Sequence, residues 1–438
     1  MFAIAWPIIL ANAAVPLLGL ADTAVIGNTG SITDLGAIAL GALLFNFLYW
    51  GFGFLRMGTT GFTAQADGAG DEAEVRATLG RALLLAGAIG ALLIVVHRPL
   101  IDLALFPFGA SDEVKALTRD YFLIRIWGAP AALAVFALMG TLIGLGRSGL
   151  LLKLQLFLNG LNIALDVLFA GVFGWGVQGI AFGTALAEWS TCLLALFLVV
   201  RMLRRRQHDL EPFWSRPRIL DAAKLRRTLG ANADIMIRTL ALLFAFAWFT
   251  HQGARFGDQV LAANHILLQF VAFSAYFLDG YAFAAEVVVG RAIGARRLDV
   301  FDAAVHRSSE LAAATAVALA LALLLFGDLA IHALTNLEAA RQTAARYLPW
   351  ACAYVLLSFA AFQLDGIFIG ATRTRDMRNA SLASLALFLL AWWPLANFGN
   401  DGLWIAFIAY VLARALALAW YYPGLRRAVS RRGVPEAG

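Results

Sequence analysis

Apolar runs long enough to cross a lipid bilayer recur along the whole chain of 438 residues. About 20 helical residues span the hydrocarbon core of a membrane. The runs are too long for the roughly ten-residue strands of an outer-membrane barrel. We therefore predict an all-α polytopic membrane protein with twelve transmembrane helices, at approximately 2–27, 34–62, 78–97, 116–145, 149–173, 177–203, 224–251, 259–290, 304–326, 338–370, 377–396 and 401–425.

The composition excludes a water-soluble enzyme domain. Hydrophobic residues make up 61% of the chain and charged residues only 14%, whereas soluble domains are about 25% charged. The net charge of +6 is interpreted as a signal of membrane orientation, and no nucleic-acid partner is predicted. Cys192 and Cys352 both fall inside apolar runs, where a buried thiol is expected rather than a disulfide.

Lysine and arginine are concentrated in alternate connections between the predicted helices. The connections around 28–33, 171–176 and 397–401 carry neither residue, whereas the segment around 204–223 is rich in arginine. Cytoplasmic loops of membrane proteins carry the excess of basic residues. We therefore predict a multi-pass protein of the inner membrane, with a cytoplasmic linker at 204–223 and both termini in the cytoplasm. The first apolar run is expected to be a retained helix rather than a cleaved leader.

An internal repeat relates the two halves of the chain. At a shift of 226 residues, Gly140 and Gly144 fall on Gly366 and Gly370, and Arg147 falls on Arg373. The repeat predicts an N-terminal six-helix lobe at 1–203 and a C-terminal six-helix lobe at 224–438. Because six is even, both copies enter the membrane in the same direction, and a pseudo-twofold axis along the membrane normal is expected. Two such lobes around a midplane site suit transport by alternating access.

The polar residues of the first half are few and lie at expected membrane depth, where an ionisable group costs about 2.5–3.5 kcal/mol on insertion scales. Asn159, Asn162 and Asp166 have the spacing i, i+3 and i+7, which places them on one helical face. Asp22 follows Pro16, and this proline predicts a bend in the first helix. We interpret these residues as candidate coupling groups. The alternatives are that Asp22 only lines a helix end and that Asp166 belongs to a satisfied network that holds helices together.

The second half offers another group of acidic residues. Asp279 and Glu286 are seven residues apart in the eighth predicted helix, and Asp365 lies in the tenth. They are candidates for a second polar cavity, or alternatively for internal ion pairs. The chain has no phosphate-binding loop, nucleophile elbow or recognised metal-binding spacing. We therefore predict neither an ATP-driven pump nor an enzyme, and no cofactor or metal site.

Several runs resemble the DinF-like branch of the multidrug and toxic compound extrusion (MATE) transporters, over essentially the whole chain. They are FLRMGTTGFTAQA at 54–66, LADTAVIG at 20–27, NGLNIALD at 159–166, LDGYAFAAE at 278–286 and VGRAIGA at 289–295. The resemblance implies a cation-coupled antiporter with two six-helix lobes arranged in a V. It also implies that the exported compounds are amphipathic and often cationic.

The family pattern places the coupling site on Asp22, Asn162, Asp166 and Thr184 of this sequence. Family members with a sodium site in the C-terminal lobe carry a glutamate within the seventh helix. Here that helix has only Asp234 near its start, which counts against sodium coupling through that lobe.

We predict a proton-coupled exporter of small organic compounds that acts as a monomer in the lipid bilayer. Carboxyl groups in apolar surroundings favour the protonated form, and Asn159, Asn162 and Thr184 are expected to donate hydrogen bonds to the carboxylates. Sodium or dual coupling stays open, since the same side chains offer several oxygens. A lipid-linked oligosaccharide flippase of the same superfamily would need a cationic cavity, whereas the inner positions are mostly acidic. An intramembrane enzyme is the remaining, disfavoured alternative.

Overall fold

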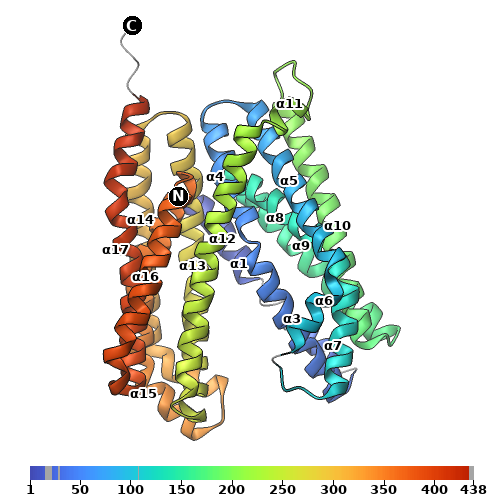
Figure 1. Ribbon diagram of the computed structural model, residues 1–438, viewed down its shortest axis with the longest axis vertical. Helices are drawn as coiled ribbons and strands as arrows, with labels where there is room; N and C mark the ends of the chain where they lie inside the picture. The colour runs from blue at the N-terminus through green and yellow to red at the C-terminus, as the bar shows by residue number, and fades with distance from the viewer. Residues whose placement is uncertain (15–21, 28–29, 107, 434–438) are drawn as a thin grey trace. The chain divides into compact units, whose positions relative to one another are not determined.

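The computed structural model describes residues 1–14, 22–27, 30–106 and 108–433, and every regular element in these ranges is helical (Figure 1). Ten helical stretches of the described chain are long and apolar enough to cross a membrane. One of them, Thr374–Ser430, contains two helices that pack against each other, α16 (Thr374–Leu395) and α17 (Gly399–Gly433). The first predicted span is described only as α1 (Phe2–Ala13) and the helical residues 22–27. The all-α polytopic fold is thereby confirmed, while the predicted bend at Pro16 lies outside the described residues.

Several predicted spans are less regular than the sequence suggested. The span at 34–62 breaks at Phe52, beside Gly53, into α3 (Ile32–Gly51) and α4 (Phe54–Gly68). The span at 116–145 consists of α7 (Asp112–Arg125), a 3₁₀ turn and α8 (Ala129–Gly144), and Pro130 occupies the first turn of α8. Apolar periodicity does not reveal such breaks, because most residues on both sides of each break are apolar.

Packing divides the chain into two compact units. The first unit contains Leu10–Thr63 and Asp71–Thr228, and the second contains Met1–Ile9, Ala64–Gly70 and Leu229–Gly438. The start of α1 and the last turn of α4 therefore pack with the C-terminal half. The predicted lobes at 1–203 and 224–438 assign both segments to the N-terminal half, so the units and the predicted lobes are not the same sets of residues.

The first unit is built mainly from the helices between α3 and α11. Besides α3 and most of α4 they are α5 (Glu72–Val95), α6 (His97–Leu105), α7 (Asp112–Arg125), the 3₁₀ turn η1 (Ile126–Gly128), α8 (Ala129–Gly144), α9 (Ser148–Asp166) with the π-helical turn η2 (Val167–Val172), α10 (Gly176–Arg206) and α11 (Arg216–Ile219). Side chains of Ser31, Asp71 and Ser111 cap the first turns of α3, α5 and α7, each satisfying a backbone N–H that has no partner within the helix.

The second unit contains the longer helices of the C-terminal half. They are α12 (Ala222–Ala254), whose first turns belong to the first unit, α13 (Asp258–Gly294), α14 (Leu298–Leu334), α15 (Glu338–Gly370), α16 (Thr374–Leu395), the 3₁₀ turn η3 (Ala396–Phe398) and α17 (Gly399–Gly433). An aromatic cluster fills its interior: the ring of Phe249 lies 4.6 Å from Phe407 and 4.9 Å from Trp404 between centroids. These distances are typical of favourable aromatic contacts.

The glycines of the internal repeat make equivalent helix contacts in both units. A Cβ atom at Gly140 of α8 would lie 2.5 Å from the carbonyl oxygen of Arg56, and one at Gly366 of α15 would lie 2.3 Å from that of Ala282. Gly144 and Gly370 are likewise in contact with the backbone one turn further on, at Thr60 and Glu286. Each pair of contacted residues is again separated by 226 positions. Glycine lets the two helix backbones touch at these points, as is common between membrane helices.

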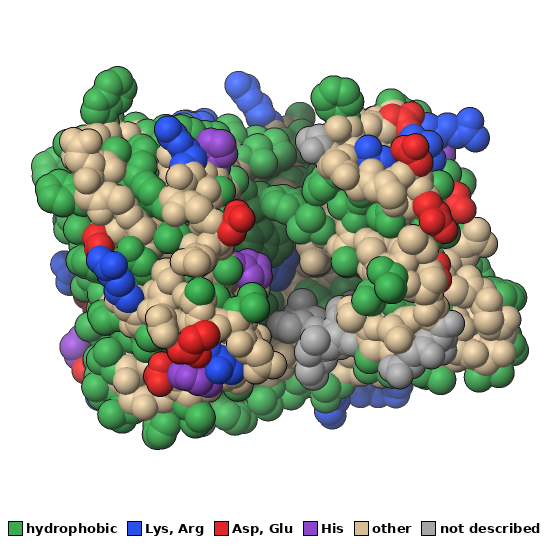
Figure 2. All heavy atoms as spheres, turned by 90° about the horizontal axis from the view of Figure 1, so that it is seen from below, with side chains coloured by type: hydrophobic (Ala, Val, Ile, Leu, Met, Phe, Trp, Pro, Cys, Tyr) green, Lys and Arg blue, Asp and Glu red, His purple; other side chains and the backbone are tan. Residues whose placement is uncertain are grey.

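Large apolar side chains are exposed on the outer surfaces of the helices. Leu321, Leu325 and Leu329 of α14 and Leu193 and Phe197 of α10 are examples. In the end view of Figure 2, many hydrophobic side chains lie along the outer edge, and charged groups are scattered among other side chains. Such a surface is unfavourable in water and suited to hydrocarbon, as expected for a protein embedded in a bilayer.

The predicted linker belongs to the first unit and packs on α5 through charged side chains. Arg76 of α5 donates to both carboxylate oxygens of Asp209, at 2.7 and 2.8 Å. Arg206 lies 2.6 Å from Glu72 of the same helix. The hydrogen bond from Arg76 lowers the pKa of the Asp209 carboxyl below its ordinary value. The link therefore persists from neutral to mildly acidic pH and is lost only when Asp209 is protonated.

Candidate functional site

Two buried carboxyl groups face each other in the first unit. Asp22 lies at the start of the helical residues 22–27 and Asp166 ends α9, and their side chains are close enough to interact directly. The residues are only 4% and 0% exposed. A Cβ atom at Gly183 of α10 would lie 2.8 Å from Oδ1 of Asp166, so glycine at this position makes room for the carboxyl. The structure thus brings together two acidic residues that are 144 positions apart in the sequence.

The neighbouring amides and hydroxyl do not donate to these carboxyls as the sequence analysis expected. Nδ2 of Asn162 donates to Oγ1 of Thr184 at 3.0 Å, and that hydroxyl donates to the backbone carbonyl of Ile180 at 3.0 Å. Nδ2 of Asn159 donates to the backbone carbonyl of Ala14 at 2.8 Å. The expectation was wrong because backbone carbonyls within reach compete for the donors, as they commonly do for threonine in a helix.

A buried arginine lies beside the acidic pair. Arg125, the last residue of α7, is 8% exposed and donates to the hydroxyl of Tyr121 at 2.7 Å. Its guanidinium lies 3.8 Å from the carboxylate of Glu188 and stacks 4.5 Å from the ring centroid of Phe45. Arg125 falls inside the predicted span at 116–145, but nothing in the sequence shows that it belongs to this cluster.

Glu188 of α10 completes the cluster. It is 7% exposed and packs so closely on the turn before α8 that a Cβ atom at Gly128 would lie 2.2 Å from its Oε2. Arg125 is also the cation that acts electrostatically on Asp22 and Asp166. Three carboxyl groups thus share one guanidinium, and full ionisation would leave an excess of two negative charges in a buried site. Such an excess is costly unless protons or another cation bind.

The acidic residues of the second unit are paired differently. Asp365 of α15 is buried and contacts the guanidinium groups of Arg238 of α12 and Arg414 of α17, the latter at 3.6 Å. Asp234 of α12 lies 2.7 Å from Arg378 of α16. Each of these carboxylates therefore has at least one permanent cation, so Asp365 takes part in the internal ion pairs that the sequence left as an alternative.

The other two acidic candidates of the second unit both lie on α13. Asp279 is half-buried and Glu286 is buried. A second polar cavity formed by these residues with Asp365 stays a prediction. Within the described residues, no three His, Cys, Asp or Glu side chains are placed to hold a metal ion.

Comparisons with known proteins give consistent matches along the chain. The family model MatE matches residues 7–168 and 235–393. The chain is 40% identical to DNA damage-inducible protein F of Escherichia coli, over 95% of this chain and 90% of that protein. It is 29% identical to the probable multidrug resistance protein NorM of Rhizobium meliloti, over 97% and 92% of the two chains.

Solved structures of similar fold include two transporters. The Vibrio cholerae MATE transporter VcmN in the bent form matches with a TM-score of 0.86 and 20% identity, over 98% of this chain and 97% of that one. The outward-facing conformation of a multidrug resistance MATE family transporter of the MOP superfamily also matches with a TM-score of 0.86, at 18% identity, over 99% and 96%. At these identities the likeness establishes the fold.

Proposed function

The chain belongs to the MatE family, as its sequence runs predicted, and on that premise we propose that it exports small organic compounds in exchange for protons. Proteins of this family are transporters rather than enzymes, so the chain is a multi-pass membrane transporter. A relative named as a probable multidrug resistance protein supports varied compounds as substrates, and the amphipathic or cationic class is what the family resemblance implies. The basic connections support an inner-membrane orientation with both termini in the cytoplasm.

The observation that carries the proposal is the buried pair of Asp22 and Asp166, on which the charge of Arg125 acts. Two adjacent carboxyl groups in an apolar bundle are most stable when at least one of them holds a proton. A proton needs a single oxygen, and it is available from either side of an energised membrane. The pair is therefore suited to bind and release protons during a transport cycle.

Coupling requires that the proton affects two conformations differently. The acidic pair joins residues 22–27 to α9, and Gly183 places α10 against the same carboxyl. Protonation changes the charge and the hydrogen bonding at this junction, so its free energy acts directly on the packing of three segments. A cationic substrate and protons are both attracted by the negative charge of the cluster, which favours their exchange.

Sodium coupling is the second candidate, and one observation favours it. Oδ1 of Asn162 is buried and accepts no hydrogen bond from the described residues, so it is available as an oxygen ligand beside Asp166. Against it, Oγ1 of Thr184 already faces the amide nitrogen of Asn162. A sodium ion would need several of these oxygens to converge, as hard cations do.

The proton proposal includes a monomeric transporter without a bound cofactor.

The test is transport by the purified protein in liposomes with ethidium as the cationic probe. We expect uptake or release driven by a pH gradient, undiminished when sodium is absent and collapsed by a protonophore. Transport that follows a sodium gradient at fixed pH would instead assign the acidic pair to a sodium site. An absence of ethidium movement under either gradient, with a panel of other organic cations equally inert, would contradict the exporter proposal.

A further inference from the structure

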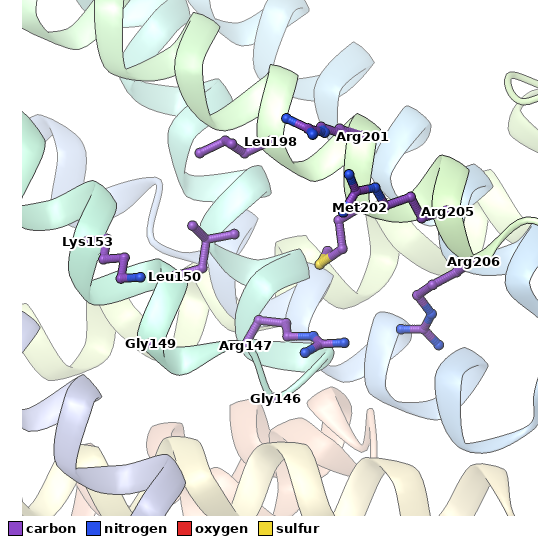
Figure 3. A pocket seen from close by; sticks show the side chains of 10 residues that line it. All are labelled: Gly146, Arg147, Gly149, Leu150, Lys153, Leu198, Arg201, Met202, Arg205 and Arg206. Carbon is purple, nitrogen blue, oxygen red and sulfur yellow. The ribbon is translucent and has the colours of Figure 1, made fainter.

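A basic pocket lies in the first unit, away from the acidic cluster. Its volume is about 830 Å³. It is lined by the turn between α8 and α9, the first turns of α9 and the last turns of α10, namely Gly146, Arg147, Gly149, Leu150, Lys153, Leu198, Arg201, Met202, Arg205 and Arg206. Figure 3 shows the side chains of the two helices facing one another across the opening. Five of the ten residues are cations, and none is acidic.

Most of this positive charge has no counter-ion in the described part of the chain. Arg206 lies 2.6 Å from Glu72 of α5. Arg147, Lys153, Arg201 and Arg205 form no ion pair with any described residue, and all four are exposed. Four neighbouring cations repel one another, so the pocket attracts an anion from its surroundings.

The internal repeat shows one difference between the halves at this place, although Arg201, Arg205 and Arg206 have arginine equivalents at Arg427, Arg431 and Arg432. Arg373, the repeat equivalent of Arg147, lies 2.7 Å from the carboxylate of Asp376. The position equivalent to Asp376 in the first half is Leu150, which lines the pocket. One copy of the repeat therefore neutralises its arginine internally, whereas the other replaces the acid by an apolar side chain.

The apolar residues of the pocket indicate what kind of anion it accepts. Leu150, Leu198 and Met202 lie among the cations, and the pocket is at the point where the apolar part of α10 gives way to arginines. A free phosphate ion has no apolar part that could contact these side chains. A phospholipid has both parts: a phosphate for the cations and an acyl chain for the leucines. Basic pockets between membrane helices at the headgroup level are suited to anionic lipids.

We propose that this pocket binds the phosphate of an anionic phospholipid, with the glycerol end of an acyl chain against its apolar side chains. Guanidinium groups suit a phosphate because they form charge-assisted, often bidentate hydrogen bonds. The proposal does not depend on the coupling ion, since the pocket shares no residue with the acidic cluster.

Binding is measured by native mass spectrometry of the full-length protein in detergent, titrated with cardiolipin, phosphatidylglycerol or phosphatidylcholine. We expect both anionic lipids to bind at least tenfold more tightly than phosphatidylcholine. The double variant Arg201→Gln/Arg205→Gln should weaken cardiolipin binding about 30-fold, the effect of two cations worth about 1 kcal/mol each near a membrane surface. Inorganic phosphate at millimolar concentration should leave cardiolipin bound.

The matched control is Arg296→Gln/Arg375→Gln, which removes the same charge from two exposed arginines of the second unit. It should bind cardiolipin like the parent. A second variant, Leu150→Asp, introduces the acid that the other repeat has and should weaken binding about fivefold, whereas Leu150→Asn should have a much smaller effect. Equal losses in the two double variants, or displacement of the lipid by inorganic phosphate, would overturn the proposal, as would unchanged binding in Arg201→Gln/Arg205→Gln.

Discussion

The two units differ in what surrounds their buried carboxyl groups. In the first unit, Asp22 faces Asp166, and both share Arg125 with a third acid. In the second unit, the single carboxylate of Asp365 is contacted by two arginines, Arg238 and Arg414. A carboxylate with fixed arginines keeps its charge balanced in every conformation that preserves the contacts, whereas a pair of acids needs a mobile cation. The difference supports our proposal that ion exchange takes place in the first unit, and it gives Asp365 a structural role in the second.

The energetic consequences of losing a carboxylate therefore differ as well. Removing one partner of a buried ion pair leaves the other charge uncompensated and costs about 3–5 kcal/mol. Removing one acid from an acid pair relieves repulsion instead. Neutral substitutions thus separate the two roles: in the first unit they should affect transport, and in the second unit stability.

The largest expected effect is on transport by Asp22→Asn. The amide has nearly the same size but does not titrate, so proton-driven ethidium transport in liposomes should fall to the level of empty liposomes, while expression and thermal stability stay near the parental values. Asp166→Asn should act in the same way. If the two carboxyl groups act together, the double variant should transport no less than either single variant.

The control for this prediction is Asp120→Asn, an exposed acid on α7 of the same unit, which should transport like the parent. If purified Asp22→Asn still exchanged protons for substrate at the parental rate, Asp22 would be only a structural polar group. It would also remove the distinction between the two units.

The next effect in size is a loss of stability in Asp365→Asn. Arg238 and Arg414 would keep their buried charges without the carboxylate, and the free energy of unfolding should fall by about 3–5 kcal/mol. Thermal unfolding in detergent measures this. The matched control is Asp302→Asn, whose exposed pair with Arg426 at 2.7 Å should contribute at most about 1 kcal/mol. If Asp365→Asn were as stable as the parent but inactive, Asp365 would belong to the coupling machinery and the comparison would fail.

The sequence predicts the fold well because its signals are local or repeated. The apolar runs predict the spans, and the repeat identifies Gly140 and Gly366, whose helix contacts are equivalent in the two units. The spacing of Asn159, Asn162 and Asp166 places them on one helix. The break at Phe52 between α3 and α4 was missed, because a short turn inside an apolar run leaves hydrophobicity unchanged.

The partners of the site residues are less predictable, because they depend on contacts between distant helices. Arg125 lies 63 positions before Glu188, and nothing in the spacing links them. Likewise, the donors of Asn159 and Thr184 bind backbone carbonyls, which are present at every residue and leave no mark in a sequence. The signal that identified the candidate residues was the scarcity of charge. Each of the few ionisable residues at membrane depth needs a partner or a function to offset the cost of its burial.

The smallest predicted effect distinguishes the two candidate ions in the first unit. Thr184→Val keeps the shape of the side chain but removes the oxygen that accepts a hydrogen bond from Asn162. For a proton held by Asp22 and Asp166, this oxygen only helps to position Asn162, and its loss should cost about 1 kcal/mol, or roughly a fivefold decrease in transport. A sodium ion would lose one of its few ligands, so sodium-driven transport should be nearly abolished. Initial rates of ethidium transport under a pH gradient and under a sodium gradient, compared for Thr184→Val and Thr184→Ser, separate these cases.

Thr184→Ser retains the hydroxyl and should behave like the parent under either ion. A complete loss of proton-driven transport in Thr184→Val, restored in Thr184→Ser, would mean that the hydroxyl takes part in ion binding and that an acid pair alone does not explain coupling.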